Sequence, residues 1–222
     1  MFETIFPRVR GDQLWQATLD TLYMTAFAGV ATFLLGLLLG AALFLTSPGQ
    51  PLANRPIYAL MSVIVNVGRA IPYIILLVLL IPFTKAVVGS ILGVNAALPS
   101  LIFGTAPFYA RLVEIAFREV DRGVIEATRA MGGGLGTILF RVMIPESSPA
   151  LVSGITVTLI ALVSFTAMAG AIGAGGLGHL AYLEGFQRNN QQVTLVATAV
   201  ILAIVFIIQL TGDRLTRFLD KR

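Results

Sequence analysis

The chain has 222 residues, of which 57% are hydrophobic and only 12% are charged, and its mean hydropathy is +0.89. Soluble domains carry about 25% charged residues, so this composition excludes an ordinary soluble domain and places most of the chain in a bilayer. The absence of cysteine excludes a disulfide framework, a thiolate nucleophile and a Cys-based zinc site. A single histidine makes a metal site built from histidines a poor reading. The net charge of +4 fits basic residues that set membrane orientation better than it fits nucleic-acid binding.

Charged residues divide the chain into five apolar stretches, each long enough to cross a hydrocarbon core about 30 Å thick. The stretches predict one transmembrane domain over 1–222 with spans at 18–46, 57–83, 92–116, 148–172 and 193–212. The first apolar run is longer than the core of a signal peptide, so we interpret it as a retained span. Neither strand alternation nor enough segments for a closed barrel is present. We therefore expect an all-α membrane protein with five transmembrane helices.

Five spans place the two termini on opposite sides of the membrane. Ten basic residues fall on one side, namely Arg55, Arg111, Arg118, Arg122, Arg129, Arg141, Arg214, Arg217, Lys221 and Arg222. Four fall on the other side, namely Arg8, Arg10, Lys85 and Arg188. Because cytoplasmic loops are enriched in Lys and Arg, we expect the N-terminus outside and the C-terminus in the cytoplasm.

The stretch 118–147 is the only long polar segment, and it predicts a short amphipathic helix in the cytoplasm. One helix face is predicted by the spacing of Val124, Ala127, Thr128 and Met131. The glycines that begin at Gly132 end this helix, since glycine favours helix C-termini. Such a short helix is marginal alone in water, so a partner surface would complete it. An ordinary solvated connector between spans is the alternative.

This loop resembles the EAA loop of ABC-importer permease subunits, which reads Glu-Ala-Ala, three residues, Gly, nine residues, Ile-x-Leu-Pro. Glu126 and Ala127 match the start, and Gly132 and Pro145 fall at the required spacings. Thr128 departs from the second alanine. The resemblance implies that an ATPase docks on Glu126, Ala127, Thr128, Arg129, Met131, Gly132 and Pro145.

The resemblance extends to the methionine-importer permease branch. It is carried by Pro48-Gly49-Gln50, by 69–78, by Ile81-Pro82-Phe83-Thr84, by Ala106-Pro107-Phe108, by 173–178 and by Gly212-Asp213-Arg214. It implies the type I importer architecture and a homodimer in the bacterial inner (plasma) membrane. Two cytoplasmic ATPase subunits and an external substrate-binding protein are the implied partners. The implied function is import of L- and D-methionine by alternating access, and another amino acid or a small peptide is the competing substrate.

The chain is not expected to be an enzyme. Neither Lys85 nor Lys221 follows a glycine, so there is no P-loop. The implied ATP and Mg²⁺ belong to the ATPase, and we expect no cofactor or metal on this chain. Gly173–Gly178 satisfies G-x-G-x-x-G but follows an apolar helix, and Glu184 is too near to serve as the acidic residue of a dinucleotide site. It fits a flexible helix end before an external loop at 177–192, where His179 is expected to be solvated or at an interface.

Within the spans, Arg69 is a functional candidate because intramembrane charges are costly. The alternative is that it snorkels from the cytoplasmic end of its span. Pro72, Pro99 and Pro107 are expected to kink their helices. Ser164, Phe165 and Met168 are candidates for the translocation path or a gate, whereas simple helix packing by small residues is the alternative.

Two other classes fit less well. A secondary transporter would more often place carboxylates inside the membrane, and here the acidic residues from 21 to 211 are expected in or beside loops: Glu114, Glu119, Asp121, Glu126, Glu146 and Glu184. An intramembrane hydrolase would need a nucleophile with a base, or metal ligands, and the chain offers few of either.

Overall fold

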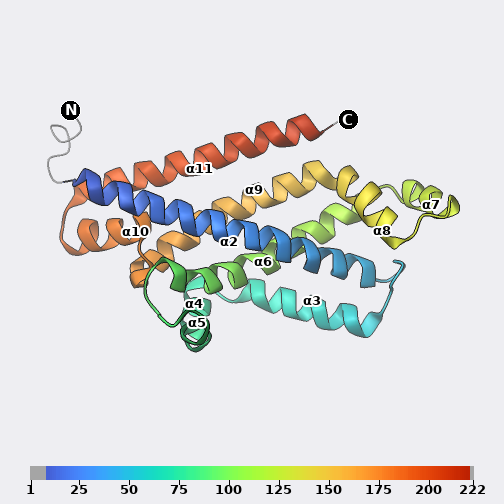
Figure 1. Cartoon of the computed structure of the whole chain (residues 1–222), viewed down its shortest axis with the longest axis horizontal. Coiled ribbons are helices and arrows are strands. Elements are labelled where there is room, and N and C mark those ends of the chain that lie inside the picture. The colour runs from blue at the N-terminus through green and yellow to red at the C-terminus, as the bar shows by residue number, and fades with distance from the viewer. Residues whose placement is uncertain (1–8, 221–222) are drawn as a thin grey trace.

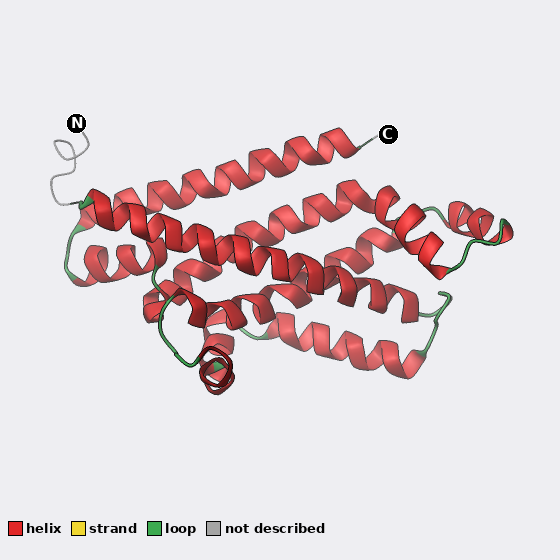
Figure 2. Cartoon of the chain, viewed as in Figure 1, coloured by secondary structure: helices red, strands yellow, loops and turns green. Residues whose placement is uncertain are grey.

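The computed structural model describes residues 9–220, and every regular element in this range is helical (Figures 1 and 2). Arg8, Lys221 and Arg222, which entered the charge argument, lie outside the described residues. The longer helices are α2 (Gly11–Thr46), α3 (Arg55–Ala70), α6 (Val94–Arg118), α9 (Ile144–Ala169) and α11 (Gln191–Leu219). The shorter ones are α4 (Tyr73–Leu79), α5 (Ile81–Val88), α7 (Arg122–Ala130), α8 (Leu135–Thr137), α10 (Gly176–Leu180) and the π-helices η1 (Ile138–Met143), η2 (Gly170–Ala174) and η3 (Ala181–Gln187).

The centre of the bundle is the close packing of α2 along α6. Gly40 makes this possible, because a Cβ atom at that position would collide with the carbonyl oxygen of Ala110. Farther along the same seam the hydroxyls of Thr32 and Thr105 hydrogen-bond at 2.6 Å, and both residues are buried. Small residues and paired hydroxyls are how membrane helices approach each other without a hydrophobic driving force. α6 therefore serves as the scaffold on which the other helices are placed.

The stretch expected as a single span at 57–83 is not one helix. Helix α3 ends at Ala70, and α4 leaves it at an angle of 107° after the Ile71-Pro72 break. Proline has no amide hydrogen and disfavours helical backbone in the preceding residue, so a helix ends naturally before it. Four helical segments are long and apolar enough to span alone among the described residues, and the bent pair can supply a fifth. Pro99 and Pro107, by contrast, lie inside the continuous helix α6.

The glycine-rich segment after α9 reverses the chain and does not lead into a loop. Gly173, Gly175 and Gly176 have φ of 102°, 86° and 79°, values that glycine adopts most readily. The expected loop at 177–192 is wrong for most of its length, because α10 and η3 occupy it. Leu177 and Leu180 form this structure because they pack into a buried cluster with residues of α11.

His179, expected to be solvated or at an interface, is half-buried and also makes a contact within the chain. Its Nδ1 lies 3.0 Å from the carbonyl oxygen of Gly170, and the contact is partly buried. Gly170 stands at the end of α9, where helix carbonyls lack partners within the helix. His179 therefore ties α10 to the end of α9.

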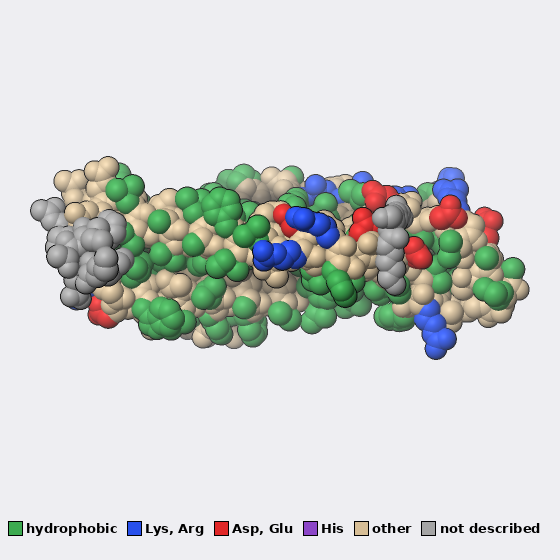
Figure 3. Space-filling model, turned by 90° about the horizontal axis from the view of Figure 1, so that it is seen from above, with side chains coloured by type: hydrophobic (Ala, Val, Ile, Leu, Met, Phe, Trp, Pro, Cys, Tyr) green, Lys and Arg blue, Asp and Glu red, His purple; other side chains and the backbone are tan. Residues whose placement is uncertain are grey.

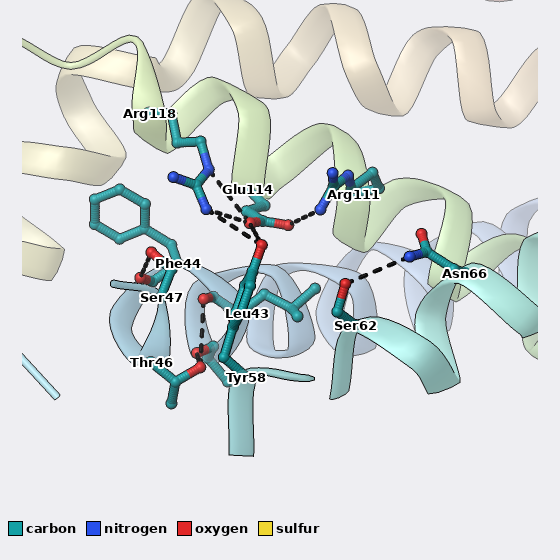
Figure 4. A network of polar contacts seen from close by, with 11 residues as sticks. Leu43, Phe44, Thr46, Ser47, Tyr58, Ser62, Asn66, Arg111, Glu114 and Arg118 are labelled. Atoms are coloured by element: carbon teal, nitrogen blue, oxygen red, sulfur yellow. Dashed lines mark hydrogen bonds and ion pairs between the residues drawn. The ribbon is translucent and has the colours of Figure 1, made fainter. Parts of the chain in front are cut away.

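A buried carboxylate joins α3 to α6 (Figure 4). Glu114 is only 1% exposed, so its expected position in or beside a loop is wrong. Arg111 and Arg118 donate to it at 2.6 Å and 2.7 Å, and the hydroxyl of Tyr58 in α3 donates at 3.2 Å. A buried carboxylate needs partners of this kind to offset its lost hydration. The cluster thus fastens the first half of α3 to α6.

We predict that Glu114→Gln destabilises the chain by about 1–3 kcal/mol, because a neutral amide cannot match the charge-assisted hydrogen bonds. Amide hydrogen exchange should increase around Tyr58, and the thermal midpoint of the purified protein should fall. The exposed Glu119→Gln is the matched control and should leave both measurements unchanged. Equal behaviour of the two variants would contradict a fastening role for Glu114.

Candidate coupling site and translocation path

Helix α7 is delimited by side-chain and backbone hydrogen bonds at both ends. The carboxylate of Asp121 accepts from the amides of Gly123 and Val124 at 2.7 Å and 3.3 Å, which is an N-cap. At the other end the Gly132 and Gly133 amides donate to the carbonyls of Arg129 and Thr128, and Gly132 has φ of 80°. This pair of bonds is the Schellman C-cap that glycine favours. The predicted helix and its glycine stop are present, and the N-cap is an additional feature.

Only one side of α7 packs against its own chain. Ile125 and Thr128 are buried, and Ile125 belongs to the cluster that contains Ile138 and Met143. The expected single face is therefore split, since Thr128 turns inward while Val124, Ala127 and Met131 are exposed. The Thr128 hydroxyl donates to the Val124 carbonyl at 2.8 Å, which satisfies it inside the fold. Ile125 was absent from the predicted face although it is the residue that anchors the helix.

The outward surface of α7 combines apolar and charged side chains. Met131 is 82% exposed and Val124 is 41% exposed, and Glu126 and Arg129 are exposed beside them. Figure 1 shows α7 at one end of the bundle, and Figure 3 shows the charged side chains gathered mainly toward that half of the molecule. An exposed methionine next to charges of both signs is a composition suited to protein contact. We call Val124, Glu126, Ala127, Arg129 and Met131 the α7 surface.

A continuous helical segment leads from the α7 surface into the bundle. Residues Leu135–Ala169 form a helical run that passes through α8, η1 and α9 without a break. Pro145 sits in the first turn of α9, where a missing amide hydrogen costs least. The wider turns of η1 precede it, and π-turns of this kind recur at functional sites. A displacement at α8 is thus passed directly to α9.

The three path candidates lie on α9, but they do not share one environment. Ser164 and Met168 are exposed, Met168 by 47%, on a face that the chain itself leaves uncovered. Phe165 turns the other way and stacks on Tyr73 of α4, with ring centroids 4.4 Å apart and planes 4° apart. The structure therefore separates Ser164 and Met168 from Phe165.

Arg69 lies at the last turn of α3, and Pro72 follows as the N-cap of α4. The guanidinium carbon is 5.8 Å from the centroid of the Phe108 ring, within the range of a cation–π contact. Arg69 is 14 positions after Arg55 at the start of α3, about 21 Å along the helix. Arg69 therefore lies at the end of α3 that is remote from the 47–54 connection.

Sequence reasoning missed Tyr73 and Asp121. Tyr73 stands directly after Pro72, and its contact with Phe165 depends on the sharp bend between α3 and α4. Asp121 carried a usable signal, because an aspartate just before a helical repeat is a frequent N-cap.

Comparison with known proteins gives one consistent result. The profile of the family described as "Binding-protein-dependent transport system inner membrane component" matches residues 34–222. The methionine import system permease protein MetP of Bacillus subtilis (strain 168) is 59% identical over all of both chains. The probable D-methionine transport system permease protein MetI of Pasteurella multocida (strain Pm70) is 43% identical over 95% of this chain and 99% of its own.

A solved structure titled "Inward facing conformations of the MetNI methionine ABC transporter" has a TM-score of 0.92 at 44% identity, with 94% of this chain and 97% of the other covered. The TM-score shows that the two chains share the helical fold. The chain belongs to the family of inner-membrane components of binding-protein-dependent transport systems.

Proposed function

We propose that the chain is the permease subunit of an ATP-driven importer of methionine, in its L and D forms. The observation that carries this proposal is 59% identity over the full length with a protein named as a methionine import permease. Similarity to the MetNI methionine transporter structure supports the same substrate. The chain contributes the membrane path, while ATP and Mg²⁺ bind in a separate ATPase subunit.

The assembly contains two copies of this chain, two cytoplasmic ATPase subunits and an external substrate-binding protein. The α7 surface is where the ATPase docks, with Gly132 and Pro145 holding the ends of the loop in place. The uncovered face of α9 with Ser164 and Met168 meets the second copy and forms the path or its gate. In this arrangement α7 and the C-terminal end of α11 face the cytoplasm, and the N-terminus faces outside. Basic residues at the α7 end support this orientation.

Alternating access then follows from the helix connections. ATP binding draws the ATPase subunits together and displaces α7. The helical run of Leu135–Ala169 carries that displacement to Ser164 and Met168. The path opens outward to receive the substrate, and ATP hydrolysis returns it to the inward-facing state.

The docking role predicts that Met131→Asp weakens assembly with the ATPase by about tenfold or more. Docking would bury the Met131 side chain against the ATPase, and the substitution places a charge in that contact. Met131 is largely exposed in the chain, so folding should be unaffected. The measurement is co-purification of the two subunits over a range of ATPase concentrations. Leu52→Asp, which alters another exposed apolar residue, is the matched control. Normal assembly of Met131→Asp would argue against docking at this surface.

The substrate proposal predicts ATP-dependent uptake of labelled methionine into proteoliposomes that hold the permease, the ATPase and the binding protein. Excess unlabelled L- or D-methionine should compete, whereas other amino acids and short peptides should not. Uptake of a different amino acid or a peptide in place of methionine would show that this compound is the substrate and that methionine is not. Uptake that needs no ATP would favour a secondary transporter instead.

A further inference from the structure

A cavity of about 230 Å³ lies where the bend between α3 and α4 meets α6 and α9. Small-ligand pockets commonly measure about 300–1,000 Å³, so this cavity suits a ligand at the small end of that range. The residues of its wall that matter for the argument are Arg69, Tyr73, Gly104, Phe108, Ala161 and Phe165. Figure 1 shows that α3 ends near the middle of the bundle, so the cavity is remote from α7.

One end of the cavity carries a positive charge that the described residues do not neutralise. Three other arginines have carboxylate partners, namely Arg111 and Arg118 with Glu114, and Arg188 with Glu184. Within residues 9–220, Arg69 forms no ion pair and instead faces the ring of Phe108. Its position, about 21 Å along α3, places it inside a hydrocarbon core about 30 Å thick. Charges at such depth normally pair or mark a substrate pathway.

Another part of the cavity wall is aromatic. Phe165 and Tyr73 form a parallel stack, and the Tyr73 hydroxyl is already hydrogen-bonded to Ser100 at 3.1 Å. Gly104 keeps this wall in place, because a Cβ there would come within 3.3 Å of the Tyr73 ring and 3.7 Å of Phe165. The wall therefore offers ring surface rather than free hydrogen-bonding groups. Rings of this kind contact aliphatic and thioether side chains favourably.

We propose that this cavity binds the transported amino acid, with its α-carboxylate on the Arg69 guanidinium and its side chain against Phe165. The inference rests on the proposed function and adds a substrate site within the membrane part of each subunit. A carboxylate supplies the negatively charged partner that Arg69 lacks among the described residues. Guanidinium groups bind carboxylates through paired hydrogen bonds. An apolar side chain on the same small molecule matches the aromatic wall. The site would hold the substrate midway along the path.

The natural absence of cysteine allows a direct test of occupancy. Ala161→Cys places a single thiol in the cavity wall, and Ile71→Cys is a second reporter on another helix if the first variant fails to insert. Alkylation of the thiol is followed in membrane vesicles from cells that express the whole transporter, both without nucleotide and with ATP and vanadate. L-methionine should slow alkylation in at least one of these states. L-methioninamide, which lacks the carboxylate, should protect much less.

Arg69→Gln should raise the half-protecting methionine concentration by about tenfold or more, as expected for loss of a charge-assisted contact. Arg69→Lys should give an intermediate value. Arg55→Gln, an exposed arginine at the other end of α3, is the matched control and should not change protection. Inorganic phosphate is included to detect a general anion site.

Equal protection in Arg69→Gln, equal protection by methioninamide or phosphate, or no protection with either reporter in either nucleotide state would overturn the site. The uptake assay distinguishes failure of the proposed function from failure of the proposed site. If another amino acid is transported, that amino acid and its amide replace methionine in the protection experiment. Methionine transport without Arg69-dependent protection would refute the site and leave the proposed function intact.

Discussion

The helical run from Leu135 to Ala169, through α8, η1 and α9, is the constraint on which the rest of the arrangement depends. Backbone groups in a bilayer must be paired, so a helix is the form in which a segment can cross while remaining stiff. This one begins at the α7 loop and ends beyond Met168. It therefore links a surface at one end of the bundle to the uncovered face of α9 by a single stretch of hydrogen-bonded backbone.

The bend after α3 interrupts a helix, in contrast to the continuous run from Leu135. By ending α3 near the middle of the bundle, it brings Arg69 and Tyr73 to the cavity that Phe165 also lines. The first half of α3 is fastened to α6 by Glu114, so the bend is held at one side by a buried ionic cluster. The molecule thus pairs one stiff helix, which transmits movement, with one interrupted helix, which makes room for a ligand.

The amino-acid sequence predicted the helical class, the α7 helix and its glycine stop, because hydropathy and local capping chemistry carry those features. It did not predict the break of the second span, because apolar composition is the same in a straight helix and in a bent one. From local polarity and glycine content, a loop was wrongly predicted over 177–187. Contacts of Leu177 and Leu180 with α11 decide the structure there. The split of the α7 face depends on Ile125 packing beneath it, which spacing alone does not reveal.

The central claim is that α8, η1 and α9 move as one body, and a distance measurement tests it directly. Spin labels on cysteines at Phe140 and Val157, both exposed, report the length of the helix, while a label pair at Phe140 and Leu60 reports its position relative to α3. Labelled copies are diluted with unlabelled ones and measured without nucleotide and with ATP and vanadate. The account predicts an unchanged distance within the helix and a changed distance to α3. A changed distance within the helix, with the distance to α3 constant, would contradict it.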